Sequence, residues 1–87
     1  MDPSVLTARL ASVAEQLGID VRFERMEEGR GGLFTLRGER RIVVNDLLPE
    51  EEKAEVLAEV LARFDLENVF LLPQVRDAIE RYRRHRG

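Results

Sequence analysis

Cysteine, tryptophan and histidine are the residue types that this chain of 87 residues lacks or nearly lacks. It has no cysteine and no tryptophan, and its only histidine is His85. Without cysteine the chain forms neither a disulfide framework nor a thiolate metal site. One histidine near the C-terminal end supplies too few ligands for zinc. We therefore expect no metal and no other cofactor, and the missing cysteines fit a reducing cytoplasm.

Long apolar runs are also missing. A transmembrane helix needs about 20 apolar residues, and residues 1–17 do not start with the basic segment of a signal peptide. With 44% hydrophobic and 36% charged residues, the composition is typical of a soluble globular protein rather than a disordered one. We expect a cytoplasmic protein that does not contact a membrane.

A nucleophile beside a base is a third absence. Ser4 and Ser12 fall in a predicted helix, and His85 falls in a predicted frayed end, so no catalytic triad is indicated. The glycine-rich EEGRGG segment leads into a strand, so no helix N-terminus would hold a phosphate there. We expect that the protein is not an enzyme and has no catalytic residues.

An excess of positive charge is absent as well, because 17 acidic residues outnumber 14 basic ones and give a net charge of −3. The whole chain therefore offers no general attraction to nucleic acid. Its basic residues nevertheless gather in the middle of the chain and at its C-terminal end. Together they would form an anion-attracting patch; alternatively, they pair with glutamates and complement a helix dipole. The candidate contacts are Arg37, Arg40, Arg41, Arg83, Arg84 and Arg86.

Periodicity predicts three helices. Asp2-Pro3 is typical of a helix start, and apolar residues at helical spacing continue to Leu17. A second helix begins near Pro49 with acidic residues in its first turn, where the helix dipole favours them. The apolar stripe of this helix consists of Leu57, Val60, Leu61 and Phe64. Pro73 begins a third.

Three strands are predicted between the first two helices. Strict alternation over residues 19–25 indicates a half-buried strand. Shorter strands are predicted at 33–37 and 41–44, joined by a tight turn at 38–40.

The resulting order, αβββαα, predicts one small α+β domain over residues 1–87, with residues 83–87 as a frayed tail. We expect a three-stranded antiparallel sheet with the helices packed on one face. Such a sheet leaves its other face and its edges open, which favours a homodimer.

The apolar connector between the second and third helices is a candidate interface. Four apolar residues in succession are more than one strand face needs. Either both sides are buried in the monomer, or one side contacts another chain. The candidate residues are Val69, Phe70, Leu71 and Leu72.

The segment GGLFTLRGERRIVVND, followed by LLPEEEKAEVLAEVLARFDLENVFLLPQVRDAIE, resembles a family of short uncharacterised bacterial proteins. The shared pattern is a Gly-Gly, a small strand, a glycine turn, a β-branched strand and a helix that opens with Pro-Glu-Glu. The resemblance implies a bacterial source and no particular activity.

The same order of elements is similar to the zinc peptidase module of the phage-repressor-cleaving metallopeptidases, whose helix carries His-Glu-x-x-His. Ala58 and Ala62 stand at the two ligand positions and Glu59 at the base position, so the resemblance implies an inactive, degenerate domain. On the predicted helix, Glu59 lies about 160° from the centre of the apolar stripe, pointing to solvent or to a partner.

The sequence therefore favours a non-enzymatic protein–protein interaction or regulatory module, with another protein or a second copy as its partner. One alternative is a nucleic-acid or anion-binding accessory protein that uses the arginines. The other is the degenerate metallopeptidase-like domain.

Overall fold

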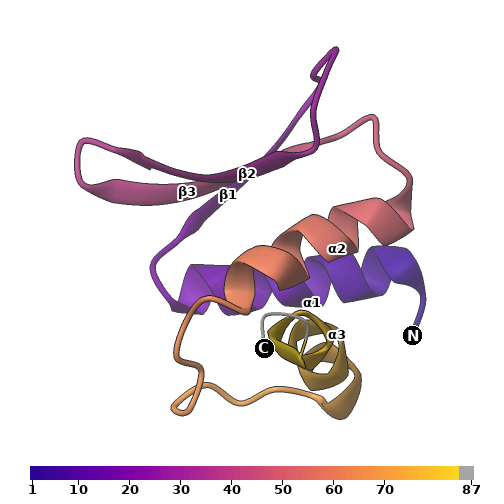
Figure 1. Cartoon of the computed structure of the whole chain (residues 1–87), viewed down its shortest axis with the longest axis vertical. Helices are drawn as coiled ribbons and strands as arrows, with labels where there is room; N and C mark the ends of the chain where they lie inside the picture. Colours follow the sequence, from indigo (N-terminus) through magenta and orange to yellow (C-terminus); the bar gives the residue numbers. More distant parts are fainter. Residues whose placement is uncertain (85–87) are drawn as a thin grey trace.

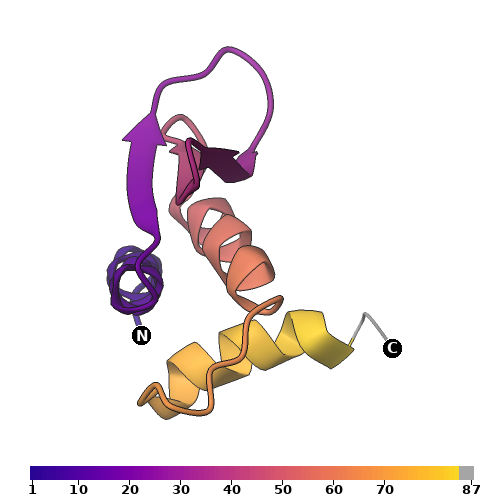
Figure 2. The same ribbon diagram turned by 90° about the vertical axis from the view of Figure 1, so that its left-hand side faces the viewer.

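Residues 1–84 form three helices and three strands, and these are the residues that the computed structural model describes. The single α+β domain, the order αβββαα and the packing of the helices on one face of the sheet are confirmed. Figure 1 shows α1 and α2 beneath the sheet, and Figure 2 shows α3 crossing below them as a further layer. In chain order the elements are α1 (Pro3–Gln16), β1 (Asp20–Glu24), β2 (Gly31–Leu36), β3 (Glu39–Asn45), α2 (Glu50–Leu61) and α3 (Pro73–Arg84).

The start of α1 is fixed by the side chain of Asp2. Its carboxylate accepts hydrogen bonds from the hydroxyl of Ser4 at 2.7 Å and from the backbone N–H of Ser4 at 2.8 Å. These bonds favour the charged form and lower the pKa of Asp2. The capping contribution is therefore present above the ordinary pKa of an aspartate, and it is lost as the pH falls through the lowered value.

The strand order differs from the predicted one. β3 lies between β1 and β2, pairing parallel to β1 and antiparallel to β2. The expectation of a purely antiparallel sheet is therefore wrong in this detail. β3 carries the two fully buried side chains of the sheet, Ile42 and Val44. The central position, with a strand on each side, removes more of such an apolar strand from water than an edge position would. Alternation within a strand shows which residues share a face, but not which strand is the neighbour.

The turn between β2 and β3 is one residue earlier than predicted. It consists of Arg37 and Gly38, both with positive φ, at 53° and 81°. Two successive residues of this kind are typical of a type I′ hairpin turn, whose twist matches that of the flanking strands. Glu39 and Arg40, expected in the turn, therefore belong to β3, and Leu36 pairs with Glu39.

Helix α2 is the centre of the core. Leu57 and Leu61 are fully buried, as the predicted stripe required. The burial is wider than that stripe because α2 packs against the sheet on one side and against α1 and α3 on the other. Ala58 and Ala62 are buried as well. None of the helices in the described part of the chain has the length and apolar character needed to cross a bilayer.

Candidate functional site

The face of the sheet opposite the helices is open among the described residues (Figure 2). Ile42 and Val44 point to the helices, so the alternation of β2 and β3 places Phe34, Leu36 and Val43 on the open face. The side chain of Phe34 is 53% exposed and that of Leu36 is 58% exposed. The β2 side of this face is therefore apolar.

The β1 side of the open face is charged. The Asp20 carboxylate accepts a hydrogen bond from Nε of Arg22 at 2.9 Å and another from Nε of Arg41 at 3.0 Å. Exposed ion pairs of this kind contribute little to stability. They keep this half of the face hydrophilic. The exposed apolar side chains of the open face are therefore confined to the half near β2.

The two edge strands differ in the same way. β1 carries the charged residues Asp20, Arg22 and Glu24, which discourage another strand from pairing with it. The sequence of β2 is GGLFTL, without charge and without proline. β2 is thus an edge strand that lacks the usual protection against pairing.

Asn45, at the end of β3, is a buried polar residue that the sequence reasoning did not single out. Its side chain is only 5% exposed. The amide oxygen accepts from the backbone N–H groups of Met26 at 3.2 Å and Leu47 at 3.0 Å. The amide nitrogen donates to the carbonyls of Met26 at 3.0 Å and Gly29 at 2.8 Å. One side chain therefore holds the β1–β2 loop against the loop that leads into α2.

The three hairpin arginines that were candidate anion contacts lie close together. Arg37, Arg40 and Arg41 line one hollow of about 370 Å³, but Asp20 and Glu39 line it too. Arg41 is paired with Asp20, and the guanidinium of Arg40 lies 5.1 Å from the centre of the Phe64 ring. The hollow is therefore of mixed charge.

The C-terminal arginines fall into three cases. Arg83, expected at the start of a frayed tail, belongs to α3 and reaches the C-terminal end of α2. Its guanidinium donates to the carbonyls of Ala62 at 3.2 Å and Phe64 at 2.6 Å, and pairs with Glu80 at 3.0 Å. Arg84 is the last residue of α3. Arg86 lies outside the described residues.

We expect Arg83→Met to lower the free energy of unfolding by about 1.5–3 kcal/mol, because hydrogen bonds from a charged group to the carbonyls after α2 would be lost. Arg76→Met is the matched control, since Arg76 lies on α3 with an exposed side chain. Urea unfolding of both variants checks this. Equal midpoints for the two variants would contradict a capping role of Arg83.

The apolar connector is divided between core and surface. Leu71 is buried, Val69 and Leu72 are partly buried against the core, and Phe70 is 80% exposed. The connector forms no strand. Of the candidate interface residues, Phe70 is thus the one that presents most of its side chain to solvent.

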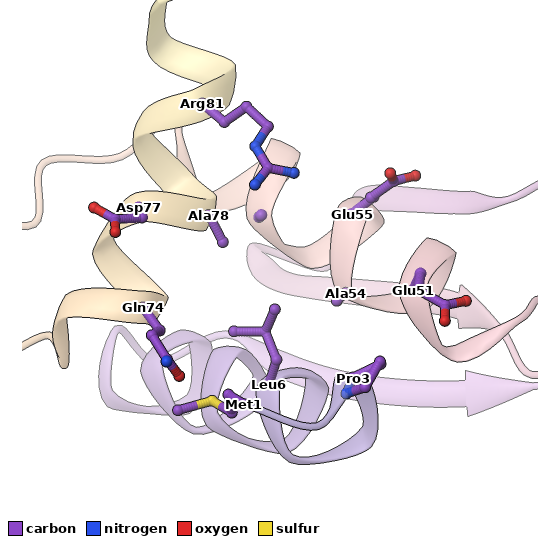
Figure 3. A pocket seen from close by; sticks show the side chains of 11 residues that line it. Met1, Pro3, Leu6, Glu51, Ala54, Glu55, Gln74, Asp77, Ala78 and Arg81 are labelled. Carbon is purple, nitrogen blue, oxygen red and sulfur yellow. The ribbon is translucent and has the colours of Figure 1, made fainter.

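A hollow of about 380 Å³ lies between α1, α2 and α3 (Figure 3). Its apolar lining includes Leu6, Ala54, Ala58 and Ala78, and its polar lining includes Glu51, Glu55, Asp77 and Arg81. Ala58, at the first ligand position of the peptidase pattern, contributes only a methyl group here. Its polar lining therefore combines three carboxylates with one guanidinium.

Glu59, at the base position of that pattern, is tied to the loop before β2. Its carboxylate lies 3.3 Å from the guanidinium of Arg30, and that of Glu55 lies 3.8 Å from it. Glu59 is partly exposed, as the helix geometry indicated, but it faces a residue of its own chain. Burial raises the pKa of the neighbouring Tyr82, and the carboxylate of Glu55 adds to the rise.

The described residues bring together no group of three His, Cys, Asp or Glu side chains that could hold a metal ion. What the molecule does present is an apolar half-face beside an uncharged edge strand. We call the residues Phe34, Leu36 and Val43, with the free edge of β2, the β2 surface. Comparisons of the chain with protein-family models, with curated proteins and with solved structures found no match.

Proposed function

We propose that the chain is a protein-interaction module rather than an enzyme, and that it binds its partner through the β2 surface. One observation carries the proposal: the exposed side chains of Phe34 and Leu36 belong to β2, an edge strand without charged residues. An open, apolar edge of this kind is an aggregation hazard unless it is paired or covered. A partner that adds a strand would remove the hazard and cover both side chains.

Burial of the exposed side chains and hydrogen bonds at the free edge would both contribute to a contact at this surface. Full burial of one Phe or Leu side chain contributes roughly 1.5–3 kcal/mol, and here each is already about half buried. The backbone groups at the free edge add hydrogen bonds that give such strand contacts their affinity. Aromatic anchors near the centre of an interface carry most of its binding energy, which makes Phe34 the residue to test.

We expect Phe34→Ser to weaken capture of the partner by at least about tenfold, a loss of about 1.4 kcal/mol. The immobilised protein is exposed to its source lysate supplemented with a labelled copy of the chain. Phe70→Ser is the control, because Phe70 is the most exposed apolar residue of the connector, the competing surface. Loss of capture in Phe70→Ser alone would transfer the contact to the connector and overturn the assignment to β2.

The alternative, binding of nucleic acid or another anion, is favoured by the hollow that Arg37, Arg40 and Arg41 share. The two carboxylates in that hollow oppose it. A single-stranded oligonucleotide passed over the wild-type protein at low salt tests this alternative, and absence of retention ends it.

A further inference from the structure

We infer that the partner of the β2 surface is a second copy of this chain, joined by antiparallel pairing of β2 with β2 about a two-fold axis at Leu33. The inference rests on the proposed function, because it names the partner of the same surface. The two sheets would then form one continuous sheet with β1 at each end. Its two remaining edges would be the charged ones.

The hydrogen bonds of the hairpin fix which groups of β2 point outward. Leu36 and Glu39 flank the two-residue turn, so this pair is hydrogen-bonded. At the other end, the N–H of Asn45 donates to the carbonyl of Arg30 at 3.0 Å. Bonded and non-bonded pairs alternate along an antiparallel ladder. The backbone groups of Gly31, Leu33 and Thr35 therefore point away from β3, toward the free edge.

One register uses all three of these residues. With the axis at Leu33, each Leu33 pairs with Leu33 of the second copy, and Gly31 pairs with Thr35 in both directions. About six backbone hydrogen bonds result. An axis at Phe34 would bring Gly31 opposite Arg37, which lies outside β2, in the turn. The register about Leu33 therefore pairs more of the outward-pointing residues of β2 than the register about Phe34.

Side chains fit the same register. It places Phe34 of each copy directly opposite Gly32 of the other, on the open face. A Cβ built at Gly32 would meet no atom within 4 Å, so no neighbouring group of the same chain covers the glycine that would face the ring. Packing of a cross-strand aromatic side chain over a strand glycine stabilises sheets. The two-fold axis makes this contact twice.

Charges at the ends of β2 are complementary as well. In an antiparallel pair, the turn of one copy lies beside the segment that precedes β2 in the other. The turn carries the exposed Arg37. The preceding segment carries the exposed Glu27 and Glu28, and its Arg30 is already paired with Glu55 and Glu59 of its own chain. Opposite charges therefore approach at both ends of the paired strands, which favours the antiparallel arrangement.

Light scattering across a range of concentrations tests this with Thr35→Pro. The N–H of Thr35 points outward, so proline removes an edge donor without removing a bond to β3. We expect a wild-type dimer, a Thr35→Pro monomer with native circular dichroism, and a dimer for the control Thr35→Val, which keeps the N–H. A Thr35→Pro variant that folds and still dimerises overturns the inference.

Cysteine cross-linking tests the register without relying on proline, because the chain has no cysteine of its own. Residues in a bonded antiparallel pair have Cα atoms about 5.5 Å apart, within disulfide range. Oxidation should therefore link two copies of Leu33→Cys. It should leave Thr35→Cys unlinked, because Thr35 faces Gly31 across the axis. Linked Thr35→Cys with unlinked Leu33→Cys overturns the register.

The two proposals fail in different ways. A wild-type chain that stays monomeric at every concentration excludes the second copy. Capture of another protein that requires Phe34 would then still support the proposed function. A dimer that survives both Thr35→Pro and Phe34→Ser overturns the inference, and capture of a partner that survives Phe34→Ser overturns the proposed function.

Discussion

Replacing Gly31 by alanine is expected to lower the free energy of unfolding by about 3 kcal/mol or more. Gly31 has a φ of 104°, a conformation that residues with a Cβ rarely adopt. A Cβ at this position would overlap the carbonyl oxygen of Val43 and lie 2.8 Å from its carbonyl carbon. These are backbone atoms of the central strand, so neither can rotate away as a side chain could.

Gly32→Ala is the matched control for Gly31→Ala. It adds the same methyl group one residue later, where nothing lies within 4 Å. We expect no loss, or a gain of up to about 1 kcal/mol from the reduced entropy of the unfolded chain. Thermal unfolding at one high dilution, at which the proposed contact between two copies at Gly32 does not contribute, measures both variants, with about 4–8 °C expected for each kcal/mol. Equal melting temperatures for the two variants would contradict the close approach at Gly31.

Asn45→Ala is the second change with a large expected effect, a loss of about 3 kcal/mol. The side chain of Asn45 makes four hydrogen bonds to backbone groups of two loops. Removing it leaves donors and acceptors without partners at a buried site, which costs about 1–3 kcal/mol for each group that water does not reach. Urea unfolding checks the loss, and Asn68→Ala is the control because Asn68 is exposed.

Asn45→Asp distinguishes the contribution of the two hydrogen bonds that the amide donates from that of the two that it accepts. The carboxylate keeps the shape and can accept from Met26 and Leu47, but it cannot donate to the carbonyls of Met26 and Gly29. We expect a loss at pH 7 at least as large as that of Asn45→Ala. Retention of wild-type stability by Asn45→Asp would show that the two donated bonds contribute nothing.

Much of the fold could be predicted from local signals. Asp2-Pro3, Pro49 and Pro73 mark where the helices begin, because a proline at the first turn costs no hydrogen bond. The alternation of β1 and the buried pair Ile42 and Val44 indicate strands. Each of these signals lies within a few residues of the feature that it predicts.

Contacts distant in sequence could not be predicted in the same way. No local pattern shows that β3 enters between β1 and β2, since that choice depends on how the whole sheet buries its most apolar strand. The pairing of Arg30 with Glu59 joins residues that are far apart in the chain. Asn45 likewise looks like an ordinary strand end until the two loops that it holds are brought together.

The candidate site was only partly visible in the sequence. The open sheet edge follows from the predicted fold, and self-association was expected from it. The sequence drew attention to the connector, because four successive apolar residues stand out. Phe34 and Leu36 alternate with other residues in a short strand, and that pattern is equally typical of a buried face. Their exposure depends on which face the helices cover.

Amide hydrogen exchange at β2 tests most directly whether this strand binds a second copy through its free edge. The amides of Leu33 and Thr35 point outward, whereas that of Phe34 is bonded to β3. We predict that Leu33 and Thr35 exchange slowly in concentrated protein and quickly on dilution, while Phe34 exchanges slowly at both concentrations. Fast exchange of Leu33 and Thr35 at every concentration would contradict the pairing of β2 with a second copy.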